Sequence, residues 1–227
     1  MNILTPLISE IKANLEMVLT LRNTKKKKAD DSYVSEGDML LDSICSNYIN
    51  KTYSSVQIIT EESYSSGDVN LAAYDYTAVV DPIDGTENFV SGLMEWGIGV
   101  CIYKGTLFHE ALIALPELNH YLLSDALVFE KFDSRIYGIS SSLSKQDLLN
   151  LEEGFEYRII GCCMYNMFCV LTGRYKMFQN PKGARSWDIL PGLNMANKLG
   201  LDVKVNNKKY NGEFLQPAEK YRFKISN

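Results

Sequence analysis

Apolar residues recur every three to four positions in two stretches near the start of the chain, and this spacing is typical of amphipathic helices. The pattern predicts a first helix over residues 3–19 and a second over residues 39–49. The connection between them contains the charged segment KKKKADDSYVSEGD. Its four lysines, residues 25–28, are expected to lie in a solvated loop.

Two short apolar runs follow, and each ends at acidic residues. VQIIT at residues 56–60 and YTAVV at residues 76–80 have the composition of strands. The first runs into Glu61 and Glu62, and the second runs into Asp81. We therefore expect the two strand ends to share one acidic site.

The middle of the chain has the pattern of three successive strands. They are separated by Lys104-Gly105 and by Pro116-Glu117, which predicts a meandering antiparallel sheet. The three runs are WGIGVCIY (residues 96–103), HEALIAL (109–115) and HYLLSDALVF (120–129).

The last part of the chain has shorter patterns. RIYGIS and YRIIG indicate a second sheet, and helical spacing predicts three further helices. These helices are expected over residues 144–151, 162–173 and 187–199. Helices and strands come in blocks rather than in strict alternation, which favours a layered α/β or α+β sandwich over a Rossmann or barrel fold.

The composition limits the class of protein. With 227 residues, 46% of them hydrophobic, the chain can bury a sizeable core. We expect one domain over residues 1–227, with provisional subdomains 1–135 and 136–227. The net charge of -5 argues against a partner that is a nucleic acid polymer. The first residues resemble neither a signal peptide nor a membrane span, and five cysteines without CxxC spacing fit reduced thiols, so we expect a cytoplasmic protein.

The segment AVVDPIDGTENF has the residue types of a metal site. Asp81 and Asp84 flank Pro82, and the turn that this proline fixes lets both carboxylates face one point beyond the strand. Hard cations such as Mg²⁺ prefer oxygen ligands, and the backbone carbonyl of Ile83 could add one more. Because the chain has only two histidines, a site built from several imidazoles is nearly excluded.

Gly85 and Thr86 follow the two aspartates. If they open a helix, their free N–H groups would suit a phosphate. The alternative is an aspartate turn without a metal, in which Asp84 or Thr86 caps the helix. A pair of acids such as Glu61 and Glu62 is often only a solvated turn, but beside the two aspartates the pair has the character of metal ligands.

Three segments in this order, IITEES, VVDPIDGTENF and SWDILPG, resemble the signature segments of the inositol monophosphatase superfamily. KADDSYVSEGD and GCCMYNMFCVLTGR are similar to two further segments of that family. The resemblance implies a layered αβαβα fold with an antiparallel N-terminal sheet and a smaller mixed C-terminal sheet. It also implies a Mg²⁺-dependent, Li⁺-sensitive phosphatase, in a family that includes inositol monophosphatase and 3'(2'),5'-bisphosphate nucleotidase branches. A homodimer is expected from the resemblance alone.

The resemblance further implies a set of metal ligands. Two or three Mg²⁺ ions would be held by four carboxylates and one carbonyl. These ligands would be Glu61, Asp81, Asp84, Asp188 and the carbonyl of Ile83. Glu61 would also count among the catalytic residues, and Asp188 would also contact the substrate.

The remaining site residues follow from the same resemblance. Asp38 would pair with Thr86 to activate the attacking water. Gly85 and Thr86 would hold phosphate through backbone N–H groups, and Glu62 would lie behind the metal ligands. The resemblance also gives an alternative to a solvated loop for residues 25–28, because the equivalent loop of the family lies near the metals and could close over the substrate. Asp188 falls at a predicted helix start, so a plain helix N-cap is the alternative interpretation of that residue.

Several positions depart from the family pattern, and they leave the substrate open. An expected E-A-G-G is Asn197-Lys198-Leu199-Gly200 here, and expected small residues after Gly161 are Cys162-Cys163-Met164-Tyr165. Cys163 and Tyr165 are expected to pack rather than bind. The chain is also short between residues 117 and 185, where relatives shape the pocket. An inositol phosphate, a sugar phosphate, a 3'-phosphonucleotide or a phosphorylated amino alcohol would all suit the acids.

Other functions fit the sequence less well. A haloacid dehalogenase phosphatase ends a strand in Asp-x-Asp-Gly-Thr, but Asp81 and Asp84 are three positions apart. No GxxxxGK[ST] segment occurs, which argues against a P-loop nucleotide hydrolase. The remaining alternative is a catalytically silent, metal-binding regulatory member of the same fold. The presence of both Asp38 and Thr86 favours the enzyme.

Overall fold

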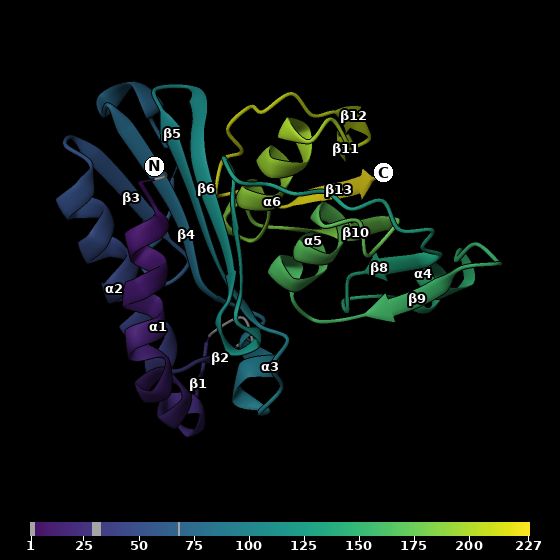
Figure 1. The fold of residues 1–227 in the computed structure, drawn as a ribbon, viewed down its shortest axis with the longest axis horizontal. Coiled ribbons are helices and arrows are strands. Elements are labelled where there is room, and N and C mark those ends of the chain that lie inside the picture. Colours follow the sequence, from purple (N-terminus) through teal and green to yellow (C-terminus); the bar gives the residue numbers. More distant parts are fainter. Residues whose placement is uncertain (1–2, 29–32, 68) are drawn as a thin grey trace.

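The computed structural model describes residues 3–28, 33–67 and 69–227, and it is built from alternating layers of helices and sheets (Figure 1). Two N-terminal helices cover a first sheet, two central helices lie between this sheet and a second one, and a short helix lies beyond the second sheet. This is the layered sandwich that the sequence predicts. Four residues of the KADDSYVSEGD segment, 29–32, fall outside the described residues.

Helices α1 (Thr5–Thr20) and α2 (Glu36–Thr52) pack on the same face of the first sheet (Figure 1). Helix α2 begins three residues earlier than the apolar spacing predicts, because Ser35 forms a capping box with Asp38. The Ser35 hydroxyl accepts a hydrogen bond from the Asp38 N–H at 3.3 Å, and the Asp38 carboxylate accepts one from the Ser35 N–H at 2.7 Å. The cap therefore gives Asp38 one fixed orientation.

The first sheet has the strand order β3-β4-β5-β6-β7. Its strands are β3 (Val56–Thr60), β4 (Tyr76–Asp84), β5 (Gly97–Lys104), β6 (Leu107–Leu115) and β7 (His120–Leu123). Neighbouring strands are antiparallel except β3 and β4, which are parallel, so the expected antiparallel sheet contains one parallel pair. The strand expected over residues 120–129 is also too long, because a turn follows Leu123 and its carbonyl accepts from the Ala126 N–H at 3.0 Å.

The second sheet has the order β12-β11-β13-β10-β8-β9 and is mixed, as predicted. Its strands are β8 (Ile136–Ile139), β9 (Glu156–Ile159), β10 (Met177–Ala184), β11 (Asp202–Val205), β12 (Lys208–Lys209) and β13 (Tyr221–Ser226). The expectation that this sheet is smaller than the first is wrong, because it has six strands and the first sheet has five. Residues 202–226 add three strands that the apolar pattern does not predict. Most of these strands are short.

The remaining elements surround the acidic motifs or connect the layers. They are α3 (Thr86–Val90), α4 (Lys145–Leu149), α5 (Cys163–Leu171), α6 (Ser186–Lys198), the paired strands β1 (Lys26–Lys27) and β2 (Tyr33–Val34), and 3-10 turns at Leu21–Thr24, Leu71–Ala73 and Pro116–Leu118. Apolar side chains of α5 and α6 form one buried core with both sheets. A second buried core lies between α1, α2 and the first sheet. Within the described part of the chain, every helix is too short or too polar to cross a bilayer.

Candidate active site

The parallel pairing of β3 with β4 brings two acidic motifs together. Thr60 pairs with Val80 at the ends of the two strands, and the Glu61 N–H donates to the Val80 carbonyl at 3.1 Å. Glu61 is therefore next to Asp81 in space. The prediction that two strand ends share an acidic site is confirmed, although β4 itself continues through the motif to Asp84.

The DPID segment is the last part of β4. The pairing of β4 with β5 shifts register between Asp81 and Asp84, which lets the strand continue through this segment. Such a bulge accommodates Pro82, which has no N–H to give to the sheet. Gly85 then turns the chain into α3 with a φ of 84°, a left-handed conformation that favours glycine. A Cβ at this position would also lie 2.9 Å from the Cβ of Cys162, so the turn packs tightly against the start of α5.

Three acidic side chains form a compact group. Glu61, Asp81 and Asp188 each offer one oxygen, and these atoms all lie within 4.8 Å of one another. Asp188 is the third residue of α6, and its carboxylate also accepts from the Arg185 N–H at 2.6 Å. The alternative interpretation of Asp188 as the N-cap is wrong, because the N-cap is Arg185, and Asp188 stabilises the helix start from its third position while also joining the acidic group.

Asp81 gives the strongest sign that this group suits a cation. Its side chain is 0% exposed, and neither of its oxygens accepts a hydrogen bond from an N–H or hydroxyl group of the described residues. A buried carboxylate without such partners is costly unless a positive charge compensates it. Three convergent carboxylates are the ligands that a hard divalent cation prefers, so the residues fit a metal such as Mg²⁺.

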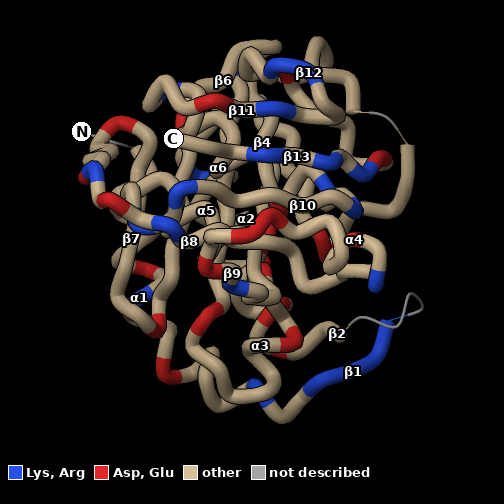
Figure 2. Tube along the Cα trace, turned by 90° about the vertical axis from the view of Figure 1, so that its right-hand side faces the viewer, with Lys and Arg blue, Asp and Glu red and all other residues tan. Residues whose placement is uncertain are grey.

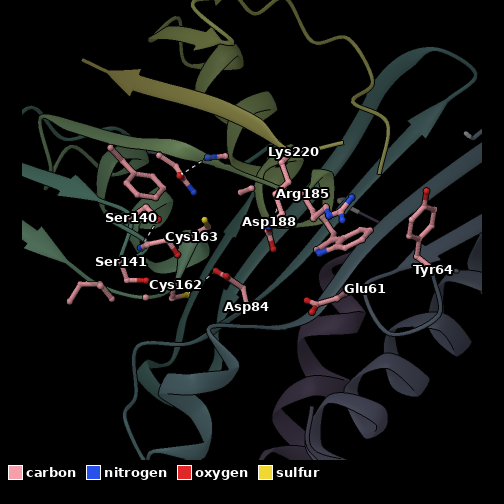
Figure 3. Close-up of a pocket in the computed structure, with 18 of the residues that line it drawn as sticks. Glu61, Tyr64, Asp84, Ser140, Ser141, Cys162, Cys163, Arg185, Asp188 and Lys220 are labelled. Atoms are coloured by element: carbon pink, nitrogen blue, oxygen red, sulfur yellow. Dashed lines mark hydrogen bonds between the residues drawn. The ribbon is translucent and has the colours of Figure 1, made fainter. Parts of the chain in front are cut away.

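Asp84 lies in the same region but faces the start of α5 (Figure 3). Its Oδ2 accepts from the Cys162 thiol at 2.9 Å and from the Met164 N–H. The structure thus brings three of the four predicted acidic ligands together and places the fourth against a helix N-terminus. The sequence analysis missed the contact with Cys162, since nothing in the GCCMYN segment indicates which residue it faces.

Asp38 and Thr86 lie within hydrogen-bonding distance, as predicted. The Thr86 hydroxyl is 3.4 Å from Oδ1 of Asp38 and 3.0 Å from the carbonyl of Ile83, and its single proton can serve one of these acceptors at a time. Asp38 is 1% exposed, and the Ser35 hydroxyl also donates to its Oδ2 at 2.6 Å. One oxygen of Asp38 is therefore occupied by the helix cap, and the other faces Thr86.

Lys28 departs from the solvated loop expected for residues 25–28 and lies beside the acids, the location that the alternative interpretation gives to this loop, whereas Lys25, Lys26 and Lys27 are exposed. Its Nζ lies 2.9 Å from Glu61 and 2.7 Å from Glu62, and the side chain is partly buried. Burial by itself lowers the pKa of Lys28, but the negative charges of Glu61 and Glu62 outweigh it and raise that pKa above the ordinary value. Lys28 thus supplies a positive charge beside the acidic group. The four consecutive lysines in the sequence do not by themselves indicate which of them contacts an acid.

The carboxyl groups themselves resist ionisation. Burial first, and the charges of neighbouring acids second, raise the pKa values of Asp81 and Asp188 well above the usual range. Burial also raises the pKa of Asp84 to about 7, despite the hydrogen bonds from Cys162 and Met164. A divalent cation would reverse this tendency, because it favours the charged form of each carboxyl group.

The metal-free protein should therefore lose stability as the pH rises. Asp84 binds its proton more tightly when folded than when unfolded, so its contribution is present below its ordinary pKa of 3.8 and lost as the pH approaches about 7. In EDTA, we expect the melting temperature at pH 8 to be lower than at pH 5.5 by about 5 °C or more. Addition of Mg²⁺ at pH 8 should recover it. Thermal unfolding followed by circular dichroism tests this, and equal melting temperatures at the two pH values would contradict it.

Two adjoining cavities meet at the acids. The larger has a volume of about 620 Å³ and the smaller about 350 Å³. Both are lined by Glu61, Asp84, Ser142, Gly161 and Asp188. Asp81, Ile83, Gly85 and Thr86 line only the smaller one, so most of the predicted site residues surround one small space. Cys163 and Tyr165 pack against the core, as expected, but Cys163 also lines the larger cavity.

Comparison with known proteins agrees with this geometry. A model of the inositol monophosphatase family matches residues 6–128, more than half of the chain. The Nus factor SuhB of Pseudomonas aeruginosa is 33% identical over 209 residues, which span 80% of this chain and 75% of that protein. A Thermotoga maritima fructose-1,6-bisphosphatase/inositol-1-monophosphatase is 24% identical over 195 residues, 78% of this chain and 73% of that protein.

The fold is shared with solved structures of the same kind. An IMPase/NADP phosphatase crystallised with NADP and Ca²⁺ superposes with a TM-score of 0.84 at 16% identity, over 99% of this chain and 89% of the other. The structural likeness extends across both sheets, and the match of the family model includes Glu61, Asp81 and Asp84. The chain belongs to the inositol monophosphatase family.

Proposed function

We propose that the protein is a Mg²⁺-dependent phosphomonoesterase that hydrolyses a small phosphorylated metabolite by attack of water. The observation that carries this proposal is the buried carboxylate of Asp81, which has no N–H or hydroxyl donor among the described residues and converges with Glu61 and Asp188. Such a group needs a cation. The adjoining cavity offers room for an organic phosphate beside it.

The acidic residues would bind the metal ions together with one backbone carbonyl. Glu61, Asp81 and Asp188 would be ligands, and Asp84 with the carbonyl of Ile83 would complete the set of ligands for two or three ions. When bound, the metal would supply positive charge that polarises the phosphoryl group and lowers the pKa of the attacking water. Lys28, which contacts Glu61 and Glu62 from the other side, would hold these two side chains in place.

Asp38 and Thr86 would prepare the water. A water molecule beside the Thr86 hydroxyl could give its proton to Oδ1 of Asp38, the oxygen that the helix cap leaves available. The backbone N–H groups of Gly85 and Thr86, at the turn after β4, would hold the phosphate oxygens. No group of the chain would need to form a covalent bond to phosphorus.

The proposal also includes the domain organisation, the oligomeric state, the location in the cell and the substrate. We infer that residues 1–227 act as a single phosphatase domain, in which residues 1–135 carry most of the acids and residues 136–227 complete the cavity. A cytoplasmic homodimer that Li⁺ inhibits agrees with the family likeness. The substrate would be an inositol phosphate, a sugar phosphate or a 3'-phosphonucleotide. The names of the Thermotoga protein and of the IMPase/NADP phosphatase favour substrates of this size.

A metal-binding regulatory protein is the second candidate. The SuhB protein at 33% identity is named a Nus factor rather than an enzyme, which favours this interpretation. The distance of 3.4 Å between the Thr86 hydroxyl and Asp38 supports the enzyme instead, since a silent member has no need of a water-activating pair.

Phosphate release from a substrate panel would separate the two candidates. Inorganic phosphate would be measured with Mg²⁺ and with EDTA for inositol, sugar, 3'-nucleotide and amino alcohol phosphates. We expect turnover of at least one class with Mg²⁺ and loss of nearly all of it with EDTA. Equal release under both conditions would overturn the metal assignment. Silence across the panel, with Mg²⁺ binding shown by calorimetry, would favour the regulatory protein.

A further inference from the structure

Cys162 stands at the start of helix α5 and faces the acidic site. It is the N-cap residue of α5, and its sulfur accepts a hydrogen bond from the Tyr165 N–H at 3.2 Å. Serine, threonine, aspartate and asparagine are the usual residues at such a position, because their side-chain oxygens accept this bond. A thiol has a single proton, and the thiol of Cys162 donates it to Oδ2 of Asp84 at 2.9 Å. The helix cap therefore directs the thiol proton toward the acidic site.

The position of Cys162 is fixed from two sides. The buried side chain of Asn166 donates to the carbonyls of Cys162 and Ile160, at 2.6 and 2.9 Å. On the other side, a Cβ on Gly85 would lie 2.9 Å from the Cβ of Cys162, so the turn after β4 packs directly on this residue. Cys162 is 3% exposed. Packing of the turn on the helix start thus holds the thiol against Asp84.

Helix α5 offers Asp84 polar groups rather than a charged side chain. The helix, CMYNMFCVL, contains no Lys, Arg, Asp or Glu, and it has neither blue nor red positions in Figure 2. The Cys162 thiol and the Met164 N–H both donate to Oδ2 of Asp84. Such donors favour the ionised form of a carboxyl group, which is the form that binds a cation. Because both bonds use Oδ2, the other oxygen can bind a metal ion while they are kept.

Asp84 is close to the acidic group without belonging to its compact part. It lines both cavities together with Glu61 and Asp188, but the oxygens that lie within 4.8 Å of one another belong to Glu61, Asp81 and Asp188. Figure 3 shows the Asp84 carboxylate turned toward Cys162, with Asp188 and Glu61 on its other side. Carboxylates that bind metal ions are in turn oriented by hydrogen bonds from outer groups. The thiol is in the place of such an outer group.

We propose that Cys162 is a positioning residue for the metal site: its thiol holds Oδ2 of Asp84, so that Oδ1 is presented to a divalent cation at the acidic group. This inference rests on the proposed Mg²⁺-dependent function and adds a residue to it. Cys162 itself binds neither metal nor substrate and acts through Asp84. The family pattern has small residues after Gly161, so this support by a thiol is a property of this chain.

Mg²⁺ titration by calorimetry, on the full chain and without substrate, tests the inference. Cys162→Ala removes the donor and should weaken Mg²⁺ binding by about tenfold or more. Cys162→Ser keeps both a donor and a cap acceptor, so it should retain most of the affinity. Cys169→Ala is the matched control, because it removes another buried thiol near the other end of the same helix, and it should bind Mg²⁺ as the wild type does.

The inference also requires that the effect of the thiol passes through Asp84. In the Asp84→Asn background, Cys162→Ala should leave the remaining Mg²⁺ affinity nearly unchanged, because two residues in one hydrogen-bond network do not act additively. A further loss as large as that in the wild-type background would mean that the thiol acts on another ligand, and would overturn the inference. Circular dichroism melting of each variant verifies that it is folded. If Cys162→Ala does not fold, Cys162→Val takes its place, since valine fills the volume of the thiol without a donor.

The remaining outcomes are distinguishable. Equal Mg²⁺ affinity in Cys162→Ala and the wild type would overturn the inference and leave the proposed function intact. Tighter binding in Cys162→Ala would overturn it too, since the thiol would then hold Asp84 away from the cation. Equal losses in Cys162→Ala and Cys162→Ser would assign the effect to packing. A wild type that binds Mg²⁺ but releases phosphate from no substrate would contradict the proposed function alone, because the titrations need no turnover.

Discussion

Replacement of Asp84 by asparagine is expected to lower Mg²⁺-dependent phosphate release by about 10³-fold or more. Loss of a residue behind a metal ligand commonly costs about 10- to 100-fold, and loss of a direct ligand should exceed that. The fold should persist, because the amide oxygen introduced in Asp84→Asn can still accept from the Cys162 thiol and the Met164 N–H. Phosphate release and Mg²⁺ titration by calorimetry, measured on the same preparation, test the prediction.

The metal-free variant should also be no less stable than the metal-free wild type. Burial and the charge of Glu61 disfavour the ionised Asp84, and asparagine removes that charge. Asp202→Asn is the matched control, since Asp202 is an exposed β11 residue that pairs with the nearby Lys204 at 3.5 Å. Full activity in Asp84→Asn would exclude Asp84 as a metal ligand. Loss of activity with unchanged Mg²⁺ affinity would assign Asp84 to substrate binding instead.

Thr86→Val should lower kcat by about 10²-fold or more while Mg²⁺ affinity remains near that of the wild type. Valine keeps the shape of threonine but removes the hydroxyl that lies 3.4 Å from Asp38. Because the proposed metal ligand at Ile83 is a backbone carbonyl, it is retained in this variant. The expected signature is therefore a defect in the chemical step without a defect in metal binding.

Thr86→Ser provides the control for this second prediction. Serine keeps a hydroxyl at the same position, so most of the activity should return. Equal losses in Thr86→Val and Thr86→Ser would show that the methyl group, and hence packing, matters rather than the hydroxyl. Wild-type turnover by Thr86→Val would remove the Asp38 and Thr86 pair from the mechanism and would leave the acidic group as a metal site only.

Local patterns in the sequence predict several elements well. The helical spacing of apolar residues indicates α1, α2, α5 and α6, and the turn residues at Lys104-Gly105 and Pro116-Glu117 separate β5, β6 and β7. These signals are local because they depend on which face of an element is buried and on backbone preferences at turns. The same holds for the DPIDGT motif, where a glycine with φ of 84° is required between the strand and α3.

The sequence patterns are less informative about the C-terminal strands. Strands β11, β12 and β13 carry lysine or arginine among short apolar runs, so their pattern is weak. Strand β13 pairs with β10, β11 pairs with β13 and β12 pairs with β11, so their formation depends on β10, a segment far from them in the chain. Lys220, the residue before β13, lines the larger cavity, so a region whose pattern predicts no strand contributes to the cavity wall.

The residues proposed to carry the chemistry can be identified from the order of amino acids: the acids after two strands, the Asp-Pro-Ile-Asp-Gly-Thr turn and the acid at the start of a late helix. Their arrangement required the folded chain, in which β3 runs parallel to β4, Glu61, Asp81 and Asp188 converge within 4.8 Å, and Asp84 faces α5. The contact of Lys28 with two of the acids also appears only in the folded chain. Side-chain type and turn preference are local properties, whereas strand direction and charge pairing depend on the packing of distant segments into one core.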